Sequence, residues 1–127
     1  MFRLCFQRSF TARHFLIGGD WGAENAPHPH RYRIEWELRA AGLDAHGYLV
    51  DLVEVERSLG DVLGRYGGAL LNDLPEFEGM NPSLERFGKL LWDRLSAPLP
   101  RGVSCAVRLW ESESAWAGYD EPPPGPG

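Results

Sequence analysis

Three histidines in the first quarter of the sequence, His14, His28 and His30, are placed to bind one metal ion together. A single residue separates His28 from His30, and side chains at positions i and i+2 of a strand point to the same face of a sheet. Two imidazoles side by side would give a zinc site two of its ligands. His14 lies in an earlier segment and is the candidate for the third ligand.

The segments that carry these histidines alternate between apolar and polar residues, which is typical of strands with one buried face. After His30 the apolar positions are Tyr32, Ile34, Trp36 and Leu38. Before His14 they are Phe2, Leu4, Phe6, Phe10 and Ala12. All three histidines continue the apolar faces, so we predict that they point inward. A lone inward histidine is usually an ordinary core residue, but three of them need many polar partners, and a shared metal supplies one for each.

The loop between the two strands contains the turn sequence Gly18-Gly-Asp-Trp-Gly22 and extends to Pro27. A loop of this length in a compact domain is more often functional than idle. Glu24 is the titratable residue that the sequence places in this loop near the histidines. His46, by contrast, has no alternation around it and is predicted to be a solvated turn residue.

The period of apolar residues becomes helical from Asp51, which is placed to cap a helix that ends at Gly67-Gly68. A second helix is predicted to begin near Asn81-Pro-Ser83, with Asn81 or Ser83 as its cap, and to stop before Pro98.

A strand then runs from about Val103, and Glu111 continues its core face. Tyr119 fits a short closing strand. Strands combined with two helices predict an α+β layer structure.

Length and composition favour one domain, residues 1–119, followed by a Pro/Gly-rich tail, residues 120–127. The net charge of -5 argues against a nucleic-acid partner, and no apolar run approaches a membrane span. The first residues lack the layout of a signal peptide, so Cys5 and Cys105 are predicted to be free thiols in a reducing cytoplasm.

A series of short motifs runs through nearly the whole chain. They are Phe10-x-Ala12-x-His14, His28-x-His30, Gly47-x-x-x-Asp51, Leu71-Asn72-Asp73, Asn81-Pro82-Ser83-x-Glu85 and Glu111-Ser112. In this order they resemble the 6-pyruvoyl-tetrahydropterin synthase family, which includes the 6-carboxytetrahydropterin synthase of the queuosine pathway. The resemblance implies the T-fold, an antiparallel sheet with two helices packed on one face. It also implies trimers that close a barrel and pair into homohexamers, with active sites between subunits.

The same resemblance implies roles for individual residues. His14, His28 and His30 would hold Zn²⁺, and the substrate would be dihydroneopterin triphosphate or a related pterin. Glu111, helped by Ser112, would bind the guanidine-like edge of the pterin through a bidentate carboxylate contact. On the strand pattern alone, Glu111 is simply a charge at the end of a strand.

The chain departs from the family pattern at three places. Pro29 replaces the glycine between the two histidines, and Glu24 stands where the family has its catalytic cysteine. Gly67-Gly68 replaces an Asp-His dyad, so the Cys-Asp-His relay of the synthase is absent. Some relatives carry Glu in place of the Cys, which implies cleavage of the side chain to a 6-hydroxymethyl pterin, although those relatives keep the dyad.

Two interpretations of Glu24 and two classes of function therefore stay open. Three histidines leave zinc with a free coordination position, as in catalytic sites, and Glu24 would then be the base. Alternatively, Glu24 is a fourth ligand that closes a structural or storage site. The corresponding functions are a zinc-dependent pterin lyase and a non-catalytic T-fold protein that binds zinc or a pterin.

Overall fold

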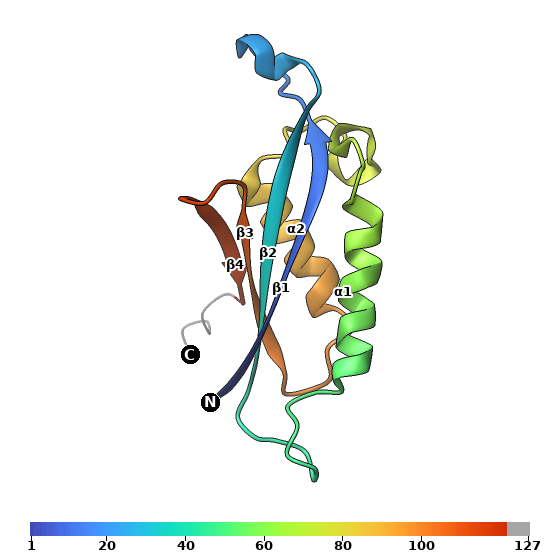
Figure 1. Ribbon diagram of the computed structural model, residues 1–127, viewed down its shortest axis with the longest axis vertical. Coiled ribbons are helices and arrows are strands. Elements are labelled where there is room, and N and C mark those ends of the chain that lie inside the picture. The colour runs from blue at the N-terminus through green and yellow to red at the C-terminus, as the bar shows by residue number, and fades with distance from the viewer. Residues whose placement is uncertain (122–127) are drawn as a thin grey trace, which may run out of the picture.

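The computed structural model describes residues 1–121 and consists of one four-stranded antiparallel sheet with two helices against it (Figure 1). The strands follow the order β1-β2-β3-β4, and their bounds are Phe2–His14, His28–Ala40, Ser104–Trp110 and Trp116–Asp120. Helix α1 spans Leu52–Tyr66 and α2 spans Leu84–Ser96. This arrangement confirms the predicted α+β T-fold and the short closing strand. Most of the predicted tail, residues 122–127, lies outside the described residues.

The two longest strands pair along their whole length and place the histidines at one end of the sheet. In their register His14 lies opposite His28, and Phe10 lies opposite Tyr32. Pro29 has no N–H to donate, and β2 pairs with β3 only from Arg33 onward, so the proline weakens no ladder on that side. The alternation predicted from the sequence is confirmed by buried residues in both strands, Phe6, Phe10, Ala12, Tyr32, Ile34, Trp36 and Leu38. Phe2, however, is 50% exposed.

Helix α1 begins and ends at its predicted caps. Helix α2 begins at one of its two candidate caps and ends before Pro98, as predicted. Asp51 caps α1 by accepting a hydrogen bond from the Val53 amide at 3.0 Å, and Gly67 follows its last residue. Ser83 rather than Asn81 caps α2, because its hydroxyl accepts from the Arg86 amide at 3.2 Å. The residues that α1 and α2 bury against the sheet and each other are Val55, Leu59, Tyr66, Phe87, Leu91 and Leu95. None of the helices in residues 1–121 is long and apolar enough to cross a membrane.

An ionic cluster at the surface, centred on the partly buried Glu76, ties α1 to α2. Its carboxylate accepts two hydrogen bonds from Arg65, at 2.7 and 2.9 Å, and one from Arg94 at 2.9 Å. The Tyr66 hydroxyl donates a fourth at 2.8 Å. The hydrogen bonds from Arg65, above all, lower the pKa of Glu76 to about 2. The carboxylate is therefore held in its charged form by partners from both helices.

We expect the stability of the fold to depend on Glu76 and on pH together. A carboxyl whose pKa is lowered on folding stabilises the folded state above its ordinary value near 4.5, and this contribution is lost as the pH falls toward 2. Glu76→Gln should lower the free energy of unfolding at pH 7 by about 2 kcal/mol, and the difference from wild type should shrink between pH 4.5 and pH 3. Urea unfolding at pH 7 and at pH 3 measures this difference in the free energy of unfolding. Glu78→Gln, at an exposed neighbour, is the control, and a loss independent of pH would contradict the prediction.

Candidate functional site

The three predicted histidines lie together at the end of β1 and the start of β2. Their candidate ligand atoms are all within 4.8 Å of one another, and the ring centroids are 4.6 to 4.7 Å apart. His14 is buried at 6% exposure, whereas His28 and His30 are half-buried. The strand register causes this convergence, because it sets His14 directly opposite His28.

Each histidine has a partner at Nδ1. His28 Nδ1 lies 2.9 Å from the Ala26 carbonyl oxygen, and His14 Nδ1 lies 3.0 Å from the Tyr32 hydroxyl. His30 Nδ1 lies 3.2 Å from Oε1 of Glu111. The Nε2 atoms of His28 and His30 are buried and have no hydrogen-bond partner among the described residues. Buried nitrogens without partners are costly, and neutral imidazoles held in this way are the donors that zinc prefers. The residues present therefore fit a zinc ion.

The electrostatic surroundings also suit a cation. Burial, followed by the neighbouring His30 and His28 rings, lowers the pKa of His14 to about 4. His14 is therefore neutral near pH 7 and keeps a lone pair for a metal. Burial, followed by the charge of Glu111, raises the pKa of the Tyr32 hydroxyl, so this group keeps its proton.

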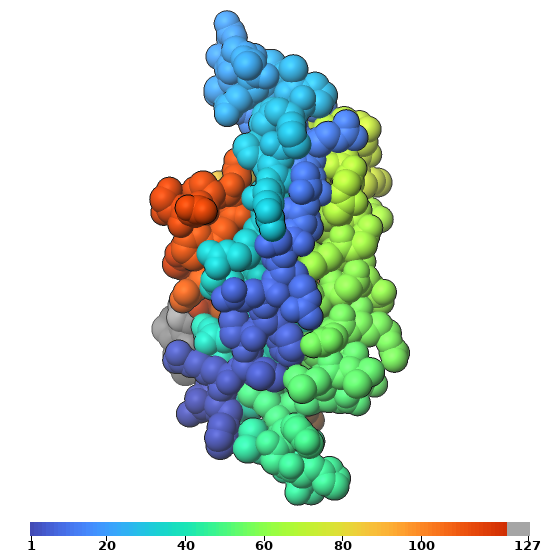
Figure 2. All heavy atoms as spheres, viewed as in Figure 1, coloured from blue at the N-terminus to red at the C-terminus, as the bar shows by residue number. Residues whose placement is uncertain are grey.

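Glu24 lies in the loop of residues 15–27, which stands clear of the sheet at the histidine end of the molecule (Figures 1 and 2). The Leu16 amide donates to the Glu24 carbonyl at 2.9 Å, and the Asn25 side chain donates to the carbonyls of Leu16 and Gly19. The backbone around Glu24 is thus fixed, while its side chain is exposed. Within residues 1–121 no carboxylate joins the histidines in a group of close ligand atoms.

Two asparagines hold the start of this loop. The Asn72 side chain accepts from the Phe15 amide and donates to the Phe15 carbonyl, both at 2.9 Å. Asn81 does the same for Ile17, at 2.7 and 3.3 Å. A side-chain amide carries the same donor and acceptor as a peptide unit, so the two asparagines replace the strand partner that β1 loses after His14. This gives a structural reason for two of the motifs found in the sequence.

The glycines that replace the Asp-His dyad lie beside β1, near the histidine end of this strand. The Gly68 amide donates to the Thr11 carbonyl at 2.6 Å, and the Arg13 amide donates to the Ala69 carbonyl at 2.8 Å. Gly68 has φ +75°, a conformation that favours glycine over other residues. The segment therefore brings the chain back along β1 but contributes no side chain that could move a proton.

Glu111 and Ser112 line a shared cavity of about 520 Å³, a size typical of small-molecule sites. Its other lining residues are Ser9, Arg31, Tyr32, Arg33, Trp110 and Glu113. The Arg33 guanidinium lies 4.6 Å from the centroid of the Trp110 ring. Because Glu111 also contacts His30, this cavity borders the histidine cluster. Ser112 is exposed, and its hydroxyl accepts from the Ser114 amide at 3.4 Å.

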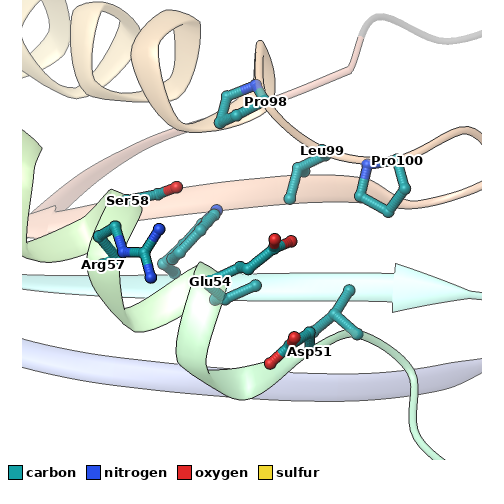
Figure 3. Close-up of a pocket in the computed structure, with 10 residues that line it drawn as sticks. Asp51, Glu54, Arg57, Ser58, Pro98, Leu99 and Pro100 are labelled. Atoms are coloured by element: carbon teal, nitrogen blue, oxygen red, sulfur yellow. The ribbon is translucent and has the colours of Figure 1, made fainter.

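A second hollow, of about 270 Å³, lies between the first turns of α1 and the segment of residues 98–100 (Figure 3). Asp51, Glu54, Arg57 and Ser58 line its helix side. None of the predicted site residues belongs to it. The candidate site is therefore the histidine end of the sheet.

Sequence reasoning missed Tyr32, Asn72 and Asn81 as parts of the site. The alternation places Tyr32 on the core face, and the sequence predicts Asn81 as a possible helix cap and as part of a family motif. For Tyr32 a signal was available, because a buried tyrosine hydroxyl usually needs a polar partner and His30 precedes it on the same face. The asparagines bind backbone more than 50 residues away in the sequence, and no local pattern indicates such a contact.

Comparisons with known proteins agree with this geometry. The family model described as 6-pyruvoyl tetrahydropterin synthase matches residues 3–122. The solved structure of the 6-pyruvoyl tetrahydropterin synthase of Caenorhabditis elegans superposes with a TM-score of 0.81 at 21% identity, covering 96% of this chain and 98% of that one. The Plasmodium vivax enzyme gives a TM-score of 0.74 at 17% identity, covering 94% and 96%. Two further structures of that enzyme are variants in which a catalytic glutamate is replaced by alanine or by cysteine. A search of curated proteins gives no significant match.

The sheet order, the two helices and the histidine cluster define a T-fold protein of the pterin-synthase class. Because the family model covers nearly the whole chain, the protein belongs to the 6-pyruvoyl tetrahydropterin synthase family.

Proposed function

We propose that this protein is a zinc-dependent lyase that acts on the side chain of dihydroneopterin triphosphate or a related pterin, as a 6-pyruvoyl- or 6-carboxytetrahydropterin synthase does. The observation that carries the proposal is the convergence of three histidines whose Nδ1 atoms all have partners. This leaves three Nε2 atoms for one metal ion. Zinc, when bound, supplies a Lewis acid that polarises a substrate oxygen and makes the neighbouring C–H group more acidic.

Glu24 is the proposed proton acceptor. Its exposed carboxylate belongs to the loop that begins directly after His14 and ends directly before His28. The absence of a carboxylate from the close group of ligand atoms favours the base over a fourth ligand. The catalytic glutamate named for the Plasmodium vivax enzyme supports the same role.

The proposed place of the pterin ring is the cavity beside Glu111. One carboxylate oxygen of Glu111 lies 3.2 Å from Nδ1 of His30. The other oxygen is free to accept from the guanidine-like edge of the ring, which gives one contact where the resemblance implies a bidentate one. Ser112 lines the same cavity and supplies a hydroxyl. A ring bound in this way directs its side chain toward the three histidines. Glu111 would then contact both the ring and the proposed zinc ligand His30.

Replacing Glu111 by Gln should weaken the binding of a pterin several-fold or more, because a charge-assisted pair becomes a neutral one. Bound zinc should remain, because the three histidines are unchanged and the glutamine Oε1 can still accept a hydrogen bond from Nδ1 of His30. Fluorescence titration with a pterin and metal analysis of the same samples measure the two effects separately. Glu78→Gln makes the same change of charge at an exposed residue outside this cavity and should bind the pterin as wild type does. Equal pterin affinity in wild type and Glu111→Gln would remove Glu111 from the ring site.

A second reaction is favoured by Glu24 itself. A glutamate in place of the family's cysteine suits cleavage of the pterin side chain to a 6-hydroxymethyl product, as the resemblance implies, although the relatives with this exchange keep the dyad that is missing here. The Plasmodium vivax enzyme, in which a glutamate is named as a catalytic residue, supports a catalytic glutamate in a protein of this fold. The two reactions use the same metal site and ring site and differ in the bond that breaks.

Incubation of the zinc-loaded protein with dihydroneopterin triphosphate, followed by identification of the product by mass spectrometry, tests the proposal. A 6-pyruvoyl or 6-carboxy product indicates the synthase reactions, the latter being the product of the queuosine pathway. A 6-hydroxymethyl product indicates the cleavage reaction. Binding of a pterin without turnover would contradict the lyase proposal and leave a non-catalytic binding protein.

The proposed assembly is a homohexamer, a dimer of trimers with active sites between subunits. Its support is the pair of open sheet edges, since within residues 1–121 β1 and β4 each have a neighbouring strand on one side only. An unpaired strand edge pairs readily with another chain, and closing the edges in a barrel removes this exposure. Light scattering should give six chain masses, and a monomer at working concentration would contradict the assembly.

A further inference from the structure

Tyr32 is a buried polar residue that the proposed reaction does not use. It lies on β2, two residues after His30, and only 1% of it is exposed. Its hydroxyl lies 3.0 Å from Nδ1 of His14, which belongs to the neighbouring strand. Among the described residues, neither of the two side chains makes any other hydrogen bond. A buried hydroxyl and a buried ring nitrogen therefore satisfy each other.

The ring of Tyr32 is held on two sides, so the position of its hydroxyl is fixed. Phe10 stacks on it with the ring centroids 5.3 Å apart, and Phe87 from α2 meets it edge-on at 5.2 Å. Side chains packed in this way have few alternative rotamers. The hydroxyl is consequently a rigid contact for His14 and restrains the rotation of the imidazole.

We propose that Tyr32 is a positioning residue for the metal site. Its hydroxyl holds the His14 ring in the orientation in which Nε2, and not Nδ1, can bind the ion. The inference rests on the proposed zinc site. A neutral imidazole carries one N–H, and metal binding at Nε2 places that proton on Nδ1. A hydroxyl can donate to Nδ1 before the metal binds and accept from it afterwards, whereas a carbonyl such as that of Ala26 only accepts. Tyr32 can therefore hold His14 in both states.

Tyr32→Phe removes the hydroxyl and keeps the packed ring, so it tests this role directly. Loss of such an outer partner typically costs about 10- to 100-fold in metal affinity. We expect a loss of this size for Zn²⁺, measured by competition with a chromophoric chelator in the absence of any pterin. The visible absorption of bound Co²⁺ should change as well, because the His14 ring is freer to turn.

The matched control is Tyr66→Phe, which removes the hydroxyl of another fully buried tyrosine. That hydroxyl donates to Glu76, away from the histidines, so this variant should lose stability but keep the Zn²⁺ affinity and the Co²⁺ spectrum of wild type. Unchanged metal affinity and an unchanged spectrum in folded Tyr32→Phe would overturn the inference while leaving the proposed zinc site intact. A wild-type protein that binds no Zn²⁺ would overturn both.

Should Tyr32→Phe fail to fold, the ¹⁵N chemical shifts of the histidines in wild-type protein decide the question. The Zn²⁺-loaded protein should show His14 coordinated through Nε2, with its proton on Nδ1. Coordination of His14 through Nδ1 would overturn the proposed role of Tyr32.

Discussion

Glu24→Gln is expected to reduce turnover by about 100-fold or more while zinc affinity barely changes, because an amide cannot accept the proton that a general base must take. The exposed carboxylate on a loop with a fixed backbone is free to approach a bound substrate. Single-turnover kinetics with dihydroneopterin triphosphate measure the chemical step, and metal analysis of the same protein measures zinc. If Glu24 were instead a fourth ligand, zinc affinity would fall and wild type would show no turnover.

A control in the same loop separates the chemistry of Glu24 from the folding of the loop. Asp20→Asn makes the same change from carboxylate to amide, and asparagine can still accept the hydrogen bond that the Gly22 amide donates to Asp20 at 3.1 Å. We expect this variant to retain most of its turnover. Full turnover in Glu24→Gln would exclude Glu24 both as the base and as a fourth zinc ligand. The base would then have to come from another subunit, since the glycines at the position of the dyad have no side chain.

His28→Ala is expected to abolish stoichiometric zinc binding, with a loss of affinity of about 100-fold or more, since removing a ligand costs at least as much as removing its outer partner. The fold should survive, because His28 is half-buried at the start of β2. Metal content after dialysis against a weak chelator is the measurement, and circular dichroism monitors the fold.

The fourth histidine provides the comparison for this experiment. His46 is exposed in the loop between β2 and α1 and does not belong to the histidine cluster. His46→Ala should therefore bind zinc as wild type does. Zinc that remains stoichiometric in His28→Ala would show that the cluster does not hold the metal.

Much of the fold could be predicted because the relevant signals are local. The alternation in the first two strands indicated which side chains point inward, and Asp51 and Gly67 marked the ends of α1. Where two local signals competed, the sequence left the choice open. Asn81 and Ser83 were both possible caps of α2, and the structure gives the cap to Ser83 because Asn81 binds Ile17 instead.

The meeting of the three histidines followed from strand phase together with the resemblance of the motifs to a known family. Strand phase alone gave a shared face, but it did not give the register that sets His14 opposite His28. That register depends on the pairing of whole strands. The resemblance supplied roles for Glu24, Glu111 and Ser112, and those roles stay predictions until the variants are measured.

The sequence by itself determined the inward face of each strand, the extent of α1, the presence of α2 and the residue types available to the site, because these depend on period and on neighbours in the chain. Only the tertiary structure decided which group meets each histidine nitrogen. The Tyr32 hydroxyl reaches His14 across the sheet, and Glu111 reaches His30 from the end of β3. Such contacts join residues far apart in the sequence and form only where register, strand ends and side-chain reach coincide. No local pattern carries that information.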